Sequence, residues 1–234
     1  MLTKASTETK PLFLDNGTTE ALKWFSLILM VADHVNKYLC NGTIPWIFQI
    51  ARLSFPLFGF VLAYNLAREN TLTKDAAKRI MQRLFAFSFF ATIPHYLLDD
   101  RWLPVNILAT LLASTATIYL YQQAGLKKWI GVCIFLASGF FVEGNWFAVA
   151  VVIMAYYYCK SPKILRLIWF IVSICVLGFL INLNQYGLAV VPIILIAPYV
   201  HIQLKRYKHV FYWFYPSHLV LILAIKEALS FNIL

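Results

Sequence analysis

The stretch that decides the fold is ILRLIWFIVSICVLGFLI, residues 164–181, in which Arg166 is the single charged side chain. A helix needs about 20 mostly apolar residues to cross the hydrocarbon core of a bilayer. Turn-forming residues bound the run on both sides, Ser161-Pro162 before it and Asn182 to Gln185 after it. The run therefore predicts a membrane-spanning helix.

Similar apolar runs occur along the rest of the chain. Overall, 61% of the residues are hydrophobic and 13% are charged, which excludes an ordinary soluble domain and a disordered chain. We predict an all-α, polytopic helical bundle with about nine transmembrane helices, the fifth and sixth of them short. The predicted spans are Ala21–Leu39, Trp46–Ala67, Arg79–Leu98, Val105–Gln122, Lys128–Val142, Asn145–Cys159, Ile164–Ile181, Tyr186–Val200 and His209–Leu229.

Charge indicates the orientation of these spans. The chain carries 20 Lys and Arg against 10 Asp and Glu, a formal charge of +10, which fits either nucleic-acid binding or membrane topology. The odd-numbered connections hold few cations, Lys37 and Arg101. The even-numbered connections and their edges hold Arg68, Lys74, Lys78, Arg79, Arg83, Lys127, Lys128, Lys160, Lys163, Arg166, Lys205, Arg206 and Lys208. The positive-inside rule then predicts a cytoplasmic N-terminus and no nucleic-acid partner.

The domain organisation follows from the same reading. Residues 1–20 include Lys4 and Lys10 but no apolar stretch, so we expect a polar cytoplasmic tail and not a cleavable signal peptide. Residues 21–234 are expected to form a single transmembrane domain.

Ionisable residues within the spans are conspicuous at three places. Asp33 and His34 lie in the first span with Lys37 one turn later, Arg52 lies in the second, and His218 lies in the ninth. Such groups are costly in a bilayer and require a partner or a function. Asp33 and Lys37 are four apart and could pair on one helix face, which would leave His34 free to face another group.

The predicted topology places these groups in the outer half of the membrane, together with His95, Asn106 and Glu143. An outward-opening polar cavity explains this economically. Purely structural explanations stay open. His34 or His218 could form a hydrogen bond between helices, Arg52 could extend to the outer membrane–water interface, and His95 and Glu143 could be solvated.

The motifs that are missing narrow the chemistry. The sequence has no His-Glu-x-x-His, Cys-x-x-Cys, Gly-x-Ser-x-Gly or Walker motif, so no metal site is predicted. A histidine base, an orienting carboxylate and an anion-binding arginine suit acyl transfer from a thioester. Arg79 and Arg83 could hold the phosphates of coenzyme A.

Several segments, taken together, resemble the TraX family, which includes the conjugative F-pilin acetylase and the related FimB fimbrial proteins. The resemblance runs from about residue 20 to the C-terminus. It is carried by Asp33-His34, Arg52-Leu53-Ser54-Phe55-Pro56-Leu57-Phe58, Asn106-Ile107-Leu108-Ala109-Thr110, Glu143-Gly144 and Phe214-Tyr215-Pro216-Ser217-His218-Leu219.

The resemblance implies a multi-pass acetyltransferase of the bacterial inner membrane, akin to transmembrane acyltransferases, which moves acetyl from acetyl-CoA to the N-terminal amine of a pilin subunit. It assigns His34 as base or acyl acceptor, Asp33 as its orienting group and Arg52 as an anion or oxyanion ligand. His218 would be a second essential group. We expect Asn106, Glu143, His95 and Lys37 to contact the substrate.

Two other classes compete with this hypothesis. In a membrane transporter, Asp33, His34, Arg52 and His218 would form a buried relay, although no inverted repeat is present. In a non-catalytic pilus or secretion assembly factor, the same residues would hold helices together.

Overall fold

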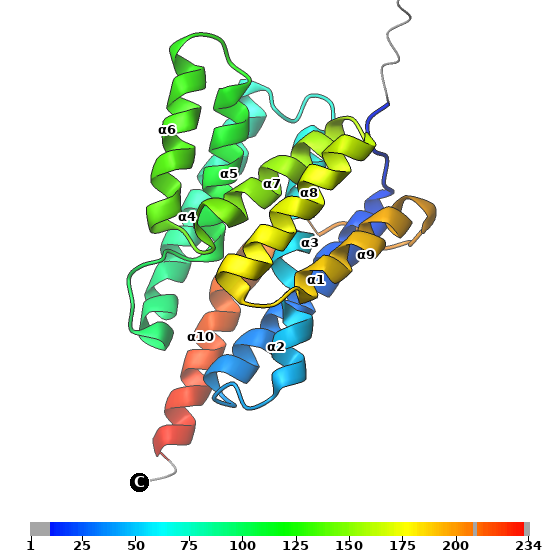
Figure 1. Cartoon of the computed structure of the whole chain (residues 1–234). Helices are drawn as coiled ribbons and strands as arrows, with labels where there is room; N and C mark the ends of the chain where they lie inside the picture. The colour runs from blue at the N-terminus through cyan, green and yellow to red at the C-terminus, as the bar shows by residue number, and fades with distance from the viewer. Residues whose placement is uncertain (1–9, 208–209, 232–234) are drawn as a thin grey trace, which may run out of the picture.

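The computed structural model describes residues 10–207 and 210–231, and within these the fold is all-α, as predicted (Figure 1). The helices run alternately up and down, so the described chain starts near the upper end of Figure 1 and α10 ends at the lower end. The main helices are α1 Asn16–Tyr38, α2 Pro45–Ala51, α3 Ser54–Ala67, α4 Lys74–Asp99, α5 Ile107–Tyr121, α6 Leu126–Phe141, α7 Asn145–Lys160, α8 Ile164–Leu177, α9 Val190–Ile196 and α10 Val210–Phe231.

Each predicted span corresponds to helical structure, although His209, the predicted start of the last span, lies outside the described residues. The seventh span continues from α8 into a π-helical turn, Gly178–Asn182. The eighth is a short helical segment in which the 3-10 turns Tyr186–Ala189 and Ala197–Tyr199 flank α9.

The second predicted span is not one continuous helix. It is broken at Arg52 and Leu53, between α2 and α3. Pro56 has no amide N–H to donate to the Arg52 carbonyl, and its ring crowds that carbonyl. The break places Arg52 at the end of a helix, where its side chain can turn toward α1.

The described part of the predicted tail packs on the bundle, and α1 begins before the predicted span does. Leu14 is buried, and its amide and carbonyl both bond to the Tyr64 hydroxyl of α3. The extended segment 200–207 crosses the start of α1 at Gly17, where a Cβ atom would lie 1.7 Å from the Ile202 carbonyl oxygen. Only a glycine permits this close approach. Residues 1–9 lie outside the described residues.

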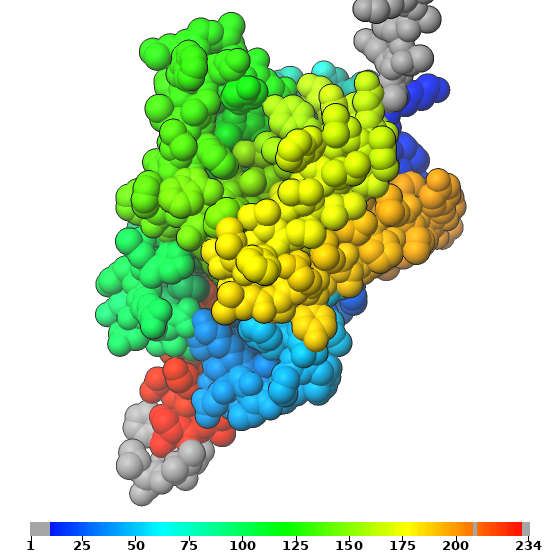
Figure 2. All heavy atoms as spheres, in the orientation of Figure 1, coloured from blue at the N-terminus to red at the C-terminus, as the bar shows by residue number. Residues whose placement is uncertain are grey.

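The core lies between α3 and α7, which pack against each other near the centre of the molecule. Phe60 of α3 and Val151 of α7 are fully buried. By contrast, α6 and α8 form much of the near surface in Figure 2, where they are green and yellow. Both helices pack against α7 from its outer side.

Two helical segments within the described residues are long and apolar enough to cross a membrane, Pro45–Ala67 and Ile164–Asn182. The outer helices also expose large apolar side chains. Phe89 in α4, Trp129 and Phe140 in α6, and Trp169 in α8 are each more than half exposed. Exposed apolar surface of this kind marks a protein or membrane contact.

Candidate functional site

Four of the predicted catalytic and binding residues line one cavity of about 320 Å³. Asp33 and His34 reach it from α1, Arg52 from the α2–α3 break, and Glu143 from the α6–α7 turn. Asn182 completes its polar lining from the π-helical turn. The structure thus brings together side chains that are far apart in sequence.

His218 of α10 contacts the His34 ring and determines which of its two nitrogens carries the proton. The Nδ1 atom of His34 is 2.7 Å from Nε2 of His218, and Nδ1 of His218 is 3.1 Å from the Phe214 carbonyl oxygen. Because a carbonyl only accepts, Nδ1 of His218 carries a proton, and Nε2 of neutral His218 accepts the bond from His34. His34 therefore has its proton on Nδ1 and a free lone pair on Nε2.

Asp33 pairs with Arg52, and the predicted pairing of Asp33 with Lys37 is wrong. The Asp33 Oδ2 atom lies 2.6 Å from Nη2 of Arg52, and both side chains are partly buried. Arg52 also donates from Nε to the Phe48 carbonyl and from Nη1 to the Asn182 side chain. An exposed pair one turn apart on a single helix is worth only about 0.2–0.5 kcal/mol, so the partly buried partner on another helix prevails.

Lys37 instead pairs with Asp99 at the end of α4, at 2.6 Å. His95, one turn before Asp99, has its Nε2 atom 3.7 Å from the same carboxylate. Lys37 also donates to the Tyr38 hydroxyl. Neither Lys37 nor His95 lines the cavity, so these two predicted substrate contacts form a separate ionic cluster beside it.

Asn106 is a structural residue and not an open substrate contact. It is fully buried and caps α5, because its Oδ1 atom accepts the Leu108 amide proton. Its Nδ2 group donates to the Ser88 carbonyl and to the Thr92 hydroxyl. Both amide protons are used, so α5 is tied to α4 through this side chain.

Glu143 is an acidic side chain that lines the same cavity from the α6–α7 turn. Its backbone is fixed by bonds to Val105 and to the Thr110 hydroxyl. Its side chain is exposed at the cavity, yet the protein around it raises the pKa of its carboxyl by desolvation, while the cations Lys37 and Arg52 oppose the rise. The group therefore stays protonated to a higher pH than an ordinary glutamate.

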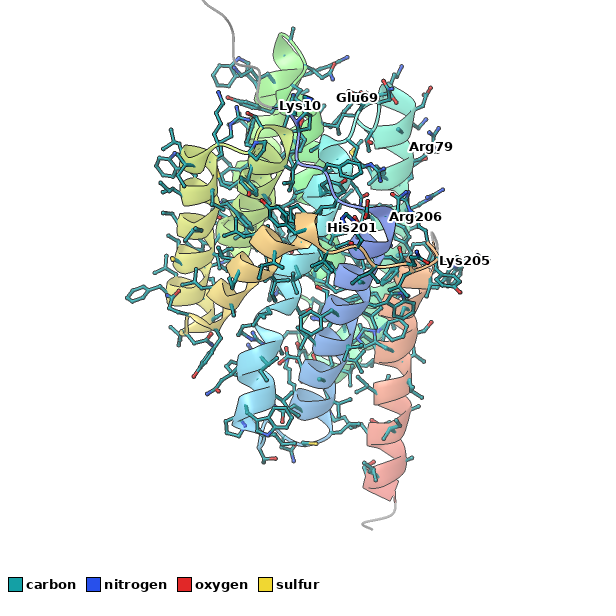
Figure 3. All side chains as sticks on the ribbon, turned by 90° about the vertical axis from the view of Figure 1, so that its right-hand side faces the viewer. Lys10, Glu69, Arg79, His201, Lys205 and Arg206 are labelled. Carbon is teal, nitrogen blue, oxygen red and sulfur yellow. The ribbon has the colours of Figure 1, made fainter. Side chains whose placement is uncertain are left out.

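A second cavity, of about 470 Å³, lies toward the end of the bundle where the cations gather. Arg83, one of the two predicted cofactor contacts, lines it, and Lys23, Arg68 and Arg206 line it as well. Arg79 does not line it. Figure 3 shows Lys10, Glu69, Arg79 and Arg206 in the upper part of the molecule.

Sequence reasoning missed three residues of this region. Asn182 and Asp99 lie in predicted connections between spans, and Glu20, which pairs with Lys23, lies in the predicted polar tail. Their polarity was visible at the span ends, but their partners come from distant helices. In residues 10–207 and 210–231, no group of three or more His, Cys, Asp or Glu side chains could hold a metal ion.

Comparison with known proteins supports one family. Two proteins named "Protein TraX", from Escherichia coli and from Escherichia coli strain K12, are each 33% identical to the chain over 92 residues. The alignment covers 39% of this chain and about a third, 35%, of each relative. No solved structure matches the chain. The family model described as "TraX protein" matches residues 18–226, which include His34 and His218, and the chain therefore belongs to the TraX family.

Proposed function

We propose that this protein is a multi-pass acetyltransferase of the bacterial inner membrane that transfers acetyl from acetyl-CoA to the N-terminal amine of a pilin subunit. The observation that carries the proposal is the hydrogen bond between His34 Nδ1 and His218, which leaves Nε2 of His34 as an acceptor on a side chain that lines a cavity beside an arginine. This arrangement supplies a base next to a donor for a developing oxyanion.

In the proposed reaction, side chains of this protein accept and return the proton that is transferred. The amine nitrogen attacks the thioester carbonyl, and Nε2 of His34 takes the proton that the nitrogen loses. Arg52 uses three of its five N–H groups on Phe48, Asn182 and Asp33, which leaves two for the oxyanion. The C–S bond then breaks, and the leaving thiolate takes the proton from His34. An acetyl-His34 intermediate would use the same nitrogen.

In this proposal, the acetyl donor and the amine acceptor each bind in one of the two cavities. The cations around the second cavity, Lys23, Arg68, Arg83 and Arg206, suit the phosphates of the acetyl donor. The carboxyl oxygens of Glu143 and Asp33 give the first cavity hydrogen-bond acceptors that suit an incoming amine group. A cytoplasmic donor and an amine presented at the outer face would meet at His34.

The membrane location in this proposal is supported by the apolar surface of the outer helices and by the up-and-down course of the chain. The cation-rich connections lie toward one end, which the positive-inside rule places in the cytoplasm.

The decisive experiment measures the intact mass of a pilin from cells that carry this gene. We expect the pilin to gain one acetyl group with the wild type and none with the His34→Ala, His218→Ala double variant at equal expression. An unmodified pilin with the wild type, together with substrate uptake by proteoliposomes, would favour a transporter. An unmodified pilin without uptake would favour an assembly factor.

A further inference from the structure

Asn182 is a polar side chain of the first cavity that the reaction described above uses only as a contact of Arg52. It lines the cavity together with His34 and Arg52. It is the last residue of the π-helical turn Gly178–Asn182, which follows α8, and its side chain is partly exposed. Single π-helical turns occur frequently at functional sites.

The contact with Arg52 determines how the Asn182 amide is turned. The Oδ1 atom of Asn182 lies 3.4 Å from Nη1 of Arg52. A guanidinium group has only donors, so the amide directs its oxygen toward Arg52 and its Nδ2 group away from it. Among the described residues, Nδ2 donates no hydrogen bond, and it is not one of the polar atoms enclosed without a partner. Two N–H donors are therefore accessible on a side chain that borders the cavity.

The π-helical turn holds Asn182 in place. Asn184 donates from its side chain to the Asn182 carbonyl at 2.8 Å and from its backbone amide to the Gly178 carbonyl at 3.0 Å. A Cβ atom on Gly178 would lie 2.5 Å from the Asn184 carbonyl oxygen, so a glycine allows the turn to close. The Asn182 backbone is thus fixed before any substrate enters, and a preorganised donor is the kind that stabilises developing charge.

We propose that Asn182 is a catalytic residue of the acyl transfer, whose Nδ2 group donates a hydrogen bond to the oxyanion together with Arg52. This inference rests on the proposed function and adds a second donor to its reaction. As the amine nitrogen bonds to the thioester carbon, the C=O electron pair moves to the oxygen, which accepts from Nδ2 and from the guanidinium. The pair returns to form C=O when the C–S bond breaks, and the proton held by His34 passes to the leaving thiolate.

The geometry of the two side chains allows them to share one oxygen. Two donors that each bind the same oxygen at about 2.9 Å can lie up to about 6 Å apart. The Nδ2 atom belongs to the same planar amide as the oxygen that lies 3.4 Å from Arg52. Arg52 also pairs with Asp33, which offsets part of its positive charge. A neutral donor beside it therefore adds stabilisation that the paired guanidinium alone does not supply.

Two substitutions separate a donor from a residue that only positions Arg52. Asn182→Asp keeps an oxygen for Arg52 and makes that contact charge-assisted, but it replaces the Nδ2 donor with an acceptor. Asn182→Leu is similar in size and removes both polar groups. Asn41→Asp is the matched control, because it is the same exchange at an exposed position between α1 and α2 that lines neither cavity.

The test uses the purified full-length protein in lipid nanodiscs, with acetyl-CoA and a peptide that has a free N-terminal amine. Mass spectrometry of the acetylated peptide gives kcat and KM, and thermal melting reports on the fold. We expect kcat to fall about 10²- to 10³-fold in Asn182→Asp and Asn182→Leu. KM for both substrates should stay near the wild-type value, because the bond is strongest in the transition state. Asn182→Asp should melt no lower than the wild type, and Asn41→Asp should keep wild-type kcat.

A kcat near the wild-type value in Asn182→Asp would overturn the inference, because Asn182 would then act at most by positioning Arg52, and the proposed function would stand. A loss of activity that follows a lower melting temperature in both Asn182 variants would also overturn it, in favour of a structural role. If the wild type acetylated no peptide, the proposed function would fail, and the inference with it.

Discussion

The Nδ1 atom of His34 in α1 lies 2.7 Å from the Nε2 atom of His218 in α10, so two histidines 184 residues apart share one hydrogen bond. The Phe214 carbonyl determines the direction of this bond, because it accepts the single ring N–H proton of neutral His218 and leaves Nε2 as an acceptor. The two residues therefore have different roles. In the proposed reaction, His34 presents the basic nitrogen, and His218 positions it.

The unequal roles of the two histidines predict unequal effects of substitution. His34→Gln should lower acyl transfer about 10²- to 10⁴-fold, the usual contribution of a general base. His218→Gln should retain more activity, because the glutamine Oε1 atom can still accept the proton of His34 Nδ1. Transfer rates of purified variants provide the measurement, and His201→Gln on the exposed segment is the control. Equal losses in both variants would contradict separate roles.

The Asp33–Arg52 pair predicts energetic coupling. Each single alanine variant leaves a partly buried charge without its partner, whereas the double variant removes both charges. We expect a coupling energy of about 0.5–3 kcal/mol in a double-mutant cycle of unfolding free energy. Arg52→Lys should not restore stability or transfer, since a single ammonium cannot reproduce the contacts to Phe48, Asn182 and Asp33. Additive single effects would refute the coupling.

The raised pKa of Glu143 predicts how stability depends on pH. Between the ordinary glutamate pKa of about 4.3 and the higher folded pKa, the folded protein binds more protons than the unfolded chain. Stability contributed by this residue therefore falls as pH rises through that window and is constant above it. Glu143→Gln should melt at a higher temperature than the wild type at neutral pH, with a difference that shrinks toward pH 4. The exposed Glu227→Gln exchange is the control, and a difference that grows toward low pH would contradict the direction.

Asn106 should affect stability and not substrate affinity. Asn106→Ala removes the cap of α5 and leaves the buried Ser88 carbonyl without this partner. Loss of a cap alone costs about 0.5–2 kcal/mol. Thermal melting in detergent and the KM for the amine substrate separate the two roles. A raised KM with unchanged melting temperature would restore Asn106 as a substrate contact.

The proposed orientation predicts which connections are accessible from outside the cell. In a variant without its four cysteines, Arg101→Cys, between α4 and α5, should react with an impermeant thiol reagent in intact spheroplasts. Ala124→Cys, between α5 and α6, should react only after the membrane is permeabilised. Both positions are exposed in the fold, so the opposite labelling pattern would reverse the orientation.

The sequence by itself determined the helical class and the approximate helix positions, because long apolar runs between turn-forming residues leave few other structures. It also singled out Asp33, His34, Arg52 and His218, since ionisable residues are conspicuous in apolar runs. These signals are local, and a single stretch of chain is sufficient to show them.

Only the tertiary structure decided which of these residues contact one another. Asp33 pairs with Arg52 and not with Lys37, because the helix break before Pro56 lets the Arg52 side chain reach α1. Asn106 became a cap because α4 brings Ser88 and Thr92 to it. The tautomer of His34 depends on α10, and the side chains that line both cavities come from four helices. Pairing between distant segments depends on the packing of whole helices, and that packing is not encoded in the pattern of any one of them.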